Sequence, residues 1–471
     1  GRAAFVGSLS LAAIAGCAPP GVSLELCDER LGAADLEHPA EHVWITCSSS
    51  QFARMRALSR EFRDRGKTVM VGGILPTMAP DAVRPWCDVL FRGEFEGAAE
   101  GLFEDFAAGR WKPEYDGGRA DLARAPRPLW DLYPNDRTML GCVQTSRGCP
   151  FDCSFCEIVA YYGRGQRHKP VGAVIAEVDA LYRLGYRSIF FTDDNIAGVP
   201  ERAKEVLAAV AAWNDRRPAD RVQFLAQMPL SAAKDAEFLA LCARSGLTHL
   251  WVGVETPDPA GMEEAGKKPN MGVDLVPALR AFAEHGISVV PSMILGFDAD
   301  GPEVFGKHER FLTEVPAPLA QLNPLVVAAG TPLHAKLKAE HRLTWGSLVA
   351  GRRWATNVIP RQLSQEALLS GLQDLAVRLF APEAFTARFK GFLEMAGRRG
   401  GAVYAAPPGA GPCHSAFEDA WALVDRRLSQ DPSLVGLRDL VAAELRARPE
   451  REAWLRTLVF FYLQAEHAVS G

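Results

Sequence analysis

Three cysteines stand close together in the segment RGCPFDCSFC (Arg147–Cys156), at spacings of four and three residues. Soft thiolate ligands suit iron–sulfur centres, and three of them on one compact loop can each bind a separate iron of a 4Fe-4S cluster. The fourth iron is then left without a protein ligand, and a catalytic metal site requires such an open coordination position. The spacing therefore predicts that Cys149, Cys153 and Cys156 hold a catalytic iron–sulfur cluster.

Two other interpretations of these cysteines stay open. A structural zinc ion is the first, with Cys142 or His168 as its fourth ligand. Zinc sites usually pair two short CxxC or CxxH knuckles, and no second knuckle occurs in the sequence. The second is a set of metal-free core cysteines, which the Gly, Pro and polar neighbours disfavour because they are typical of an exposed loop.

The elements that must position this loop lie between residues 126 and 345, where apolar and helical segments alternate. Six apolar segments are predicted as strands: Met139–Ser146, Ser188–Asp193, Gln223–Gln227, His249–Glu255, Ser288–Leu295 and Gln321–Val327. Six such βα units predict a partial (β/α)6 barrel, and barrel enzymes place their chemistry at the carboxyl ends of the strands. Asp193, Asp194, Asn195, Gln227 and Glu255 occur at these ends, although the Asp-Asp-Asn run could also cap a helix and Glu255 could occupy a solvated turn.

Residues 1–125 predict a separate α/β domain. Its strands are expected at Val22–Cys27, Val43–Cys47, Thr68–Gly73 and Cys87–Glu94, with an amphipathic helix at Gln51–Arg65. This alternation is typical of a Rossmann-like, doubly wound parallel sheet, although no GxGxxG fingerprint of a dinucleotide site is present. The chain opens directly in a helical pattern (residues 3–15), so we expect the first strand of this domain to lie upstream of the sequence.

Ligands of such sheets bind outside the carboxyl ends of the strands. Gly72 and Gly73 would let a bulky ligand approach the backbone closely, and the neighbouring hydroxyl groups can bond amides. The residues predicted to bind a ligand there are Ser48, Ser49, Gln51, Gly72, Gly73, Thr77, Gly93 and Glu94.

Residues 346–471 predict a helical C-terminal domain, with helices at Glu366–Leu379, Phe417–Leu428 and Leu437–Ala465. We expect the substrate between this domain and the barrel mouth. Tyr161, Tyr162, Arg164, Arg167 and His168 are candidates to line that space, although such a run is equally often ordinary packing.

The composition limits the class of protein. With 52 Lys and Arg against 57 Asp and Glu, the net charge is −5, which gives no support for broad nucleic-acid binding. Ten cysteines in 471 residues are too few for a disulfide scaffold. The most apolar N-terminal stretch (residues 5–17) is too short to span a bilayer. We therefore expect a cytoplasmic protein that binds a small-molecule substrate, without a nucleic-acid or membrane partner and as a monomer.

The cysteine motif, with Phe155 before Cys156, resembles that of the radical S-adenosylmethionine (SAM) superfamily. The segments CEIVAYYGRGQRHK, FFTDDN, WVGVETPD and MILGFDAD resemble its cobalamin-binding subgroup, class B methylases that include hopanoid C-2 methylases. This resemblance implies that SAM chelates the open iron. It further implies SAM contacts from Asp193, Asp194, Asn195, Gln227 and Glu255.

The N-terminal domain resembles the cobalamin domains of that subgroup. The DxHxxG motif that supplies a histidine to cobalt is absent. The resemblance therefore implies cobalamin in its base-off form, without a histidine ligand and carrying the methyl group as methylcobalamin. Arg54 or Leu75 would face the lower side of cobalt.

The resemblance implies methyl transfer to a poorly nucleophilic carbon, or phosphorus, of a small molecule or natural product. One SAM would methylate cobalt and a second would yield a 5′-deoxyadenosyl radical, with electrons from an external flavodoxin- or ferredoxin-type donor. Rivals are a cobalamin-dependent cyclase or rearrangement enzyme, and a polar methylase such as a tryptophan methylase, in which Glu255 or Glu157 would occupy the open iron. A methylthiotransferase acting on RNA and a non-catalytic cobalamin sensor are less favoured.

Overall fold

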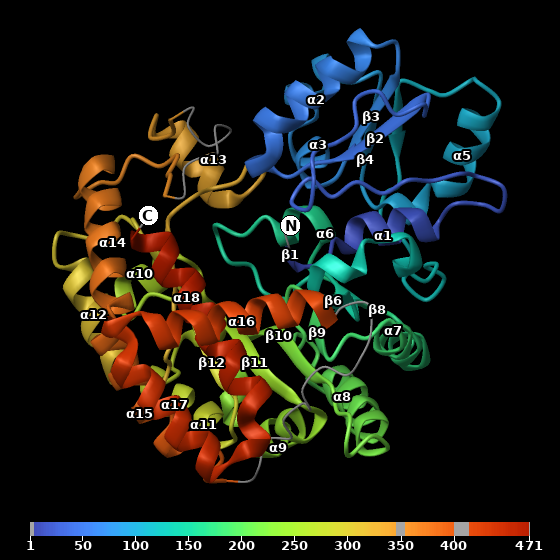
Figure 1. Ribbon diagram of the computed structural model, residues 1–471. Helices are drawn as coiled ribbons and strands as arrows, with labels where there is room; N and C mark the ends of the chain where they lie inside the picture. Colours follow the sequence, from blue (N-terminus) through green and yellow to red (C-terminus); the bar gives the residue numbers. More distant parts are fainter. Residues whose placement is uncertain (1–3, 345–353, 400–413, 471) are drawn as a thin grey trace.

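The computed structural model describes residues 4–344, 354–399 and 414–470, with side chains given outside 414–417 and 470. Figure 1 shows a sheet of the N-terminal part (blue) beside a larger curved sheet (green to yellow), and a group of C-terminal helices (orange to red) against the larger sheet. The predicted fold class is therefore confirmed: an α/β protein with a Rossmann-like part, a partial barrel and a helical C-terminal part.

The larger sheet is the predicted partial barrel, and all of its strand pairs are parallel. Its strands, in spatial order, are β1 (Ala4–Val6), β6 (Thr138–Val143), β9 (Ser188–Phe191), β10 (Gln223–Pro229), β11 (Leu247–Glu255), β12 (Ser288–Leu295) and β13 (Gln321–Pro324). The helices between them are α7 (Val171–Arg183), α8 (Pro200–Asp215), α9 (Ala236–Ser245), α10 (Pro259–Glu264), α11 (Leu275–Glu284) and α12 (Val304–Glu314). All six strands predicted from the sequence are thus present, because buried parallel strands appear in sequence as nearly continuous apolar runs.

Strand β1 corrects the interpretation of the chain's opening. The segment predicted as helical begins as a strand that pairs with β6, with Ala4 opposite Thr138 and Val6 opposite Leu140. Helix α1 (Leu9–Gly16) follows it. The first strand seen therefore belongs to the barrel sheet and not to the Rossmann-like sheet, so the segment 1–125 contributes to both. A strand of three residues is too short for its periodicity to be recognised.

The Rossmann-like sheet has four parallel strands in the order β2 (His42–Thr46), β3 (Thr68–Gly72), β4 (Val89–Arg92) and β5 (Glu114–Asp116). Its helices are α2 (Phe52–Asp64), α3 (Ile74–Met78), α4 (Pro80–Val83) and α5 (Ala99–Ala107). The predicted strand at Val22–Cys27 is wrong: this segment forms no strand, and its side chains are exposed or only partly buried. Apolar residues in a surface loop can imitate the alternation of a strand.

The C-terminal part consists of α14 (Gln365–Phe380), α15 (Pro382–Met395), α16 (His414–Gln430), α17 (Val435–Ala447) and α18 (Glu452–Ser470). The helix expected over Leu437–Ala465 is therefore two helices, separated near Pro449 because proline favours a helix start. The domain boundary predicted between residues 345 and 346 falls within residues 345–353, which are outside the described part of the chain. Helix α13 (Pro332–Ala339) precedes that boundary.

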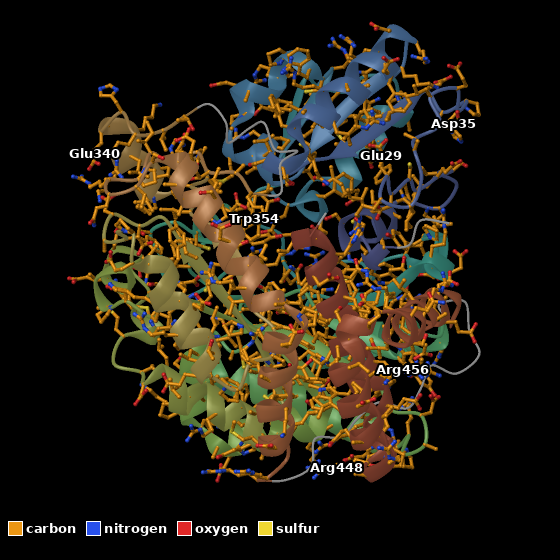
Figure 2. The ribbon with its side chains drawn as sticks, turned by 60° about the vertical axis from the view of Figure 1, so that its left-hand side comes forward. Glu29, Asp35, Glu340, Trp354, Arg448 and Arg456 are labelled. Atoms are coloured by element: carbon orange, nitrogen blue, oxygen red, sulfur yellow. The ribbon has the colours of Figure 1, made fainter. Side chains whose placement is uncertain are left out.

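Helix α18 packs against the barrel strands. The Phe461 ring lies 6.0 Å from the rings of both His249 and Trp251, and 4.8 Å from Phe5 of β1. The Thr457 hydroxyl lies 3.3 Å from Gln223 Nε2 in β10. Because the sheet is only a partial barrel, this helix covers side chains that further strands would cover in a closed barrel. Figure 2 shows the C-terminal helices from a second direction, with Arg456 on α18 and Arg448 directly after the end of α17.

None of the helices described has both the length and the apolar composition to cross a bilayer.

Candidate functional site

The three motif cysteines lie on one loop at the carboxyl end of the barrel sheet. This cysteine loop (residues 148–156) runs from β7 (Ser146–Arg147) to α6 (Ile158–Tyr162), and β7 pairs with β8 (Arg167–His168) beyond it. Cys149, Cys153 and Cys156 are free thiols and partly exposed. The Cys149 N–H donates to the Gly163 carbonyl at 3.3 Å, and the Cys156 N–H donates to that of Cys153 at 3.2 Å. Three accessible thiols on one hydrogen-bonded loop fit the ligand set of a cluster.

Asp193 holds the base of this loop. Its carboxylate is fully buried and accepts bonds from the Thr145 N–H at 3.0 Å, the Thr145 hydroxyl at 2.8 Å and the Ser146 hydroxyl. These donors occupy both carboxylate oxygens. We therefore interpret Asp193 as a positioning residue for the loop, whereas the sequence suggested contact with SAM.

The next two residues face the site more directly. The Asn195 amide nitrogen lies 3.8 Å from the Cys149 sulfur. Asp194 is partly exposed as a residue, but its Oδ2 atom is buried and has no hydrogen-bond partner among the described residues. Burial, and then the charge of Asp193, raise the pKa of Asp194 to about 7. A carboxyl group with a free oxygen at a strand end is suited to bind an ammonium or hydroxyl group.

Gln227 and Glu255 lie on the barrel strands as predicted, in different environments. The Gln227 side chain is exposed although both of its neighbours in β10 are buried, so it faces open space. Glu255 is buried and has a φ of +69°, which is rare for a residue other than glycine. A register shift interrupts β11 between Gly253 and Glu255. Such bulges re-aim side chains next to active sites.

The Glu255 carboxylate is aimed at a lysine that the sequence interpretation missed. Lys267 Nζ lies 2.7 Å from Glu255 Oε1, and the two side chains are 14% and 5% exposed. Burial opposes the charged form of Lys267, but Glu255 and the nearby Cys153 raise its pKa to about 12. The only signal in the sequence was a polar AGKKPN turn after a short helix, which a surface loop would also show.

The zinc alternative gains no ligand from Cys142. This thiol is fully buried in β6, and its sulfur lies 3.4 Å from the Gly7 carbonyl oxygen. His168 is partly exposed in β8. Within residues 4–344, 354–399 and 414–470, no group of three or more His, Cys, Asp or Glu side chains converges on a single-ion site.

The second group of predicted site residues lies at the strand ends of the Rossmann-like sheet. Ser48, Ser49, Gly72, Gly73, Thr77 and Gly93 are all partly exposed there, and Gln51 is exposed. The Thr77 hydroxyl accepts a bond from the Gly93 N–H at 2.9 Å and donates to the Gly73 carbonyl at 2.8 Å, which links the ends of β3 and β4. The Ser48 N–H donates to Gln51 Oε1 at 2.9 Å in a capping box that starts the next helix.

Gly73 is required by the sheet and not directly by a ligand. It has a φ of +109°, and a Cβ atom at this position would lie 2.8 Å from the Cys47 carbonyl oxygen. The close approach predicted at the glycine pair is therefore an approach of the neighbouring strand end. The small residue still leaves the surface above it open.

Glu94 does not face a ligand at these strand ends. It is 4% exposed, and both of its oxygens bind arginines of the barrel part: Arg147 Nη1 at 2.7 Å, and the two Nη atoms of Arg167. Arg147 also reaches Glu96, with Nη2 2.6 Å from Oε1. This buried ion cluster joins the end of β4 to the first residue of the cysteine motif. We correct Glu94 from a ligand contact to a residue that holds the two parts together.

Three other residues singled out from the sequence, Tyr161, Leu75 and Arg54, lie in different environments. The Tyr161 hydroxyl donates to the Gly93 carbonyl at 3.4 Å, so α6 borders the strand ends. Leu75 is buried at the start of α3. Arg54 is exposed on α2 and forms a two-bond ion pair with Glu29 at 2.5 and 2.8 Å. Glu29 lies on the N-terminal part in Figure 2.

Comparisons with known proteins bear on the family of this chain. The Radical SAM superfamily profile matches residues 143–312, and a profile described as a domain of unknown function (DUF4070) matches residues 331–415. The chain is 30% identical over 395 residues to the hopanoid C-2 methylase of Rhodopseudomonas palustris (strain TIE-1), covering 82% of this chain and 73% of the relative. It is 25% identical to the bacteriochlorophyllide d C-12(1)-methyltransferase of Chlorobaculum tepidum, over 69% of this chain and 72% of the relative.

A solved structure shares the fold. The radical SAM methyltransferase TsrM from Kitasatospora setae, with cobalamin and a 4Fe-4S cluster bound, superposes with a TM-score of 0.60 at 18% identity, over 72% of this chain and 74% of that chain. The 30% identity to the hopanoid C-2 methylase extends over more than two thirds of both chains. The chain therefore belongs to the cobalamin-binding radical SAM methylase family.

Proposed function

We propose that this enzyme moves a methyl group from SAM, by way of cobalamin, to a poorly nucleophilic carbon or phosphorus of a small molecule or natural product. One observation carries the proposal: the cysteine loop and the open strand ends of the Rossmann-like sheet adjoin one another, joined by the buried Arg147–Glu94 pair. When bound, the cluster supplies the electron that cleaves SAM and cobalamin carries the methyl group. The protein contributes binding, orientation and exclusion of water.

The residues of the barrel part fit the iron–sulfur cluster and SAM. Cys149, Cys153 and Cys156 would hold the cluster, with the Asn195 amide orienting the Cys149 sulfur. Asp194, with its free carboxylate oxygen, and the exposed Gln227 amide would bind the polar groups of SAM. Asp193 and Glu255 would act indirectly, Asp193 through the base of the loop and Glu255 through Lys267.

The residues of the Rossmann-like part fit a large, flat ligand. Small side chains and backbone groups dominate the partly exposed strand ends, and a broad surface of this kind can lie against a corrin ring. The residues proposed to border it are Ser48, Ser49, Gln51, Gly72, Gly73, Thr77 and Gly93, with Leu75 beneath.

We further propose the base-off form of cobalamin without a histidine ligand. His42 begins β2, at the opposite end from the proposed surface, and its ring lies 5.0 Å from Phe106 and 5.3 Å from Trp111. His38 pairs with Glu25 at 2.6 Å. Both rings thus have partners away from the strand ends.

The test is anaerobic incubation of the reconstituted enzyme with SAM, a reductant and candidate substrates, followed by mass spectrometry. S-adenosylhomocysteine with a product heavier by one methylene group supports methyl transfer. Simultaneous 5′-deoxyadenosine supports the radical route, whereas its absence favours a polar methylase. A product that gains no methylene group, formed without S-adenosylhomocysteine, would identify the cyclase or rearrangement class. A flavodoxin- or ferredoxin-type donor and a monomeric state remain predictions, checked by substituting the donor for the chemical reductant and by light scattering.

A further inference from the structure

A buried lysine, Lys267, lies beside the cysteine loop. The proposed function above makes it the partner of Glu255 but does not say what its charge does. Lys267 is 14% exposed and paired with Glu255. A Cβ atom on Gly266, the residue before Lys267, would lie 3.5 Å from the Ser154 backbone nitrogen and 4.0 Å from the Cys153 Cα atom. The lysine therefore follows directly on a backbone segment packed against the part of the loop that carries Cys153.

The backbone fastens this lysine to the loop. The Ser154 N–H, between two ligand cysteines, donates to the Ala265 carbonyl at 2.9 Å, and the Ser154 hydroxyl donates to the Glu264 carbonyl at 3.0 Å. On the other side, the Asn270 amide donates to the Gly253 carbonyl of β11 at 2.8 Å. The segment 264–270 is thus held between the cysteine loop and the bulge of β11, with Lys267 in its middle.

The bulge is shaped around the ion pair. A Cβ atom on Gly253 would lie 2.5 Å from both Lys267 Nζ and Glu255 Oε1. Glu255 keeps its positive φ only because the surrounding contacts enforce it, and such strain is concentrated at functional sites. The charge of Lys267 is therefore fixed in place at the expense of local backbone strain and of any side chain at position 253.

We propose that Lys267, held by Glu255, sets the reduction potential of the cluster by stabilising its reduced form. This inference rests on the proposed function, because it takes Cys149, Cys153 and Cys156 as the cluster ligands. Reduction adds one electron, and thus one negative charge, without making or breaking a bond. A buried cation lowers the energy of that added charge strongly, because the interior screens it less than water does.

The neighbouring lysine is a matched control. Lys268 carries the same charge one residue later, but its side chain is 69% exposed and pairs with Asp152 at 2.9 Å. Solvent and salt screen such a charge. Lys268 should therefore have little effect on the cluster.

The experiment is a redox titration of the reconstituted full-length enzyme without SAM, substrate or cobalamin, with the reduced cluster measured by electron paramagnetic resonance. For Lys267→Met we expect the equilibrium constant of reduction to fall at least tenfold, which for one electron is a shift of about 59 mV to more negative potential. Lys268→Met should change this constant less than twofold. Lys267→Arg should stay near the wild type because it keeps the charge.

Two further variants keep the inference testable if Lys267→Met does not assemble a cluster. Glu255→Gln should shift the potential in the opposite direction, because it removes the countercharge and leaves the lysine. The double variant Lys267→Met/Glu255→Gln should lie between the two single variants.

Equal potentials in wild type, Lys267→Met and Glu255→Gln would overturn the inference, as would equal shifts for Lys267→Met and Lys268→Met. An effect of Lys267→Met seen only after SAM is added would also overturn it and assign the lysine to SAM binding. Wild-type protein without iron and sulfide would instead refute the proposed function.

Discussion

The two halves of the site are built in different ways. The cysteine loop is held by buried charged groups, with Asp193 at its base, Arg147 at its start and Lys267 at its side. The strand ends of the Rossmann-like sheet are held mainly by the backbone, and their small residues are linked through the Thr77 hydroxyl.

This difference matches what each half is proposed to bind. Metal ligands must be held within a fraction of an ångström, and buried hydrogen bonds to charged groups supply that precision. A large flat ligand needs an open surface and few directional bonds. The ion cluster of Arg147, Glu94, Glu96 and Arg167 joins the halves, so the spacing between them is set by electrostatics as well as by packing.

The sharpest test separates the two halves. Cys149→Ala should abolish SAM cleavage, because the cluster loses one of three ligands, and should leave cobalamin binding intact, because the strand ends belong to another sheet. Deoxyadenosine production and the visible spectrum of bound cobalamin measure the two effects. Cys27→Ala, at an exposed thiol, is the control. Loss of cobalamin together with the cluster would mean that the halves do not bind independently.

The joint between the halves should be the next most sensitive point. Glu94→Gln takes the carboxylate partner from Arg167 and leaves Arg147 with Glu96 alone, and it should lower the free energy of unfolding by about 3 kcal/mol. Urea denaturation measures this loss of unfolding free energy. Glu114→Gln is the control: it also pairs with two arginines but is 31% exposed, so we expect a loss of about 0.5 kcal/mol. Similar losses for both variants would contradict the role given to burial.

On the cysteine-loop side, Asp193→Ala removes the acceptor of three bonds and should cost about 3 kcal/mol, together with most of the bound iron. Urea denaturation and iron analysis are the measurements. Asp235→Ala removes a partly exposed helix cap, in which Asp235 accepts from the Phe238 N–H at 2.9 Å, and should cost about 1 kcal/mol without loss of iron. Full iron content in Asp193→Ala would refute the anchoring role.

On the strand-end side, Gly73→Ala should cost about 2 kcal/mol, because alanine at a φ of +109° is strained and its Cβ meets the Cys47 carbonyl. Cobalamin affinity should fall with it, measured by equilibrium dialysis. Gly101→Ala, in α5 with open space around it, should instead stabilise by about 0.5 kcal/mol. Unchanged stability of Gly73→Ala would show that the strand end can move.

The smallest effect is expected at Arg54. Its ion pair with Glu29 is exposed, so Arg54→Ala should change stability by about 0.5 kcal/mol or less and leave cobalamin affinity unchanged. Thermal denaturation measures the stability, and equilibrium dialysis measures the cobalamin affinity. A marked loss of affinity would restore the sequence-based suggestion that this side chain faces cobalt.

The sequence was informative wherever a signal is local. The six barrel strands were predicted because each is a run of apolar residues, and the three cysteines because their spacing lies within ten residues. The signal failed where it was short or ambiguous. β1 has three residues, and the alternation at Val22–Cys27 belongs to a loop.

The residues to which the structure suggests a new role share one feature. Glu94 closely follows the end of strand β4, as a ligand-binding residue would. Its partners Arg147 and Arg167, however, are 53 and 73 residues away along the chain. Asp193 is 48 residues from Thr145, and the segment that carries Lys267 is bonded to the cysteine loop through Glu264 and Ser154, which are 110 residues apart. A side chain's chemistry is visible in a sequence, but its partner is not.

Residue types and local spacing were thus enough to establish the cluster motif, the strand-and-helix alternation and the family resemblance. These depend on neighbours along the chain, and the chemistry of thiolates is the same wherever they lie. Folding settled which acidic groups stay open to bind ligands, which become buried anchors, and which lysine stands beside the thiols. Burial and long-range pairing change the free energy of a charged group by several kcal/mol, and both depend on residues brought together from distant parts of the chain.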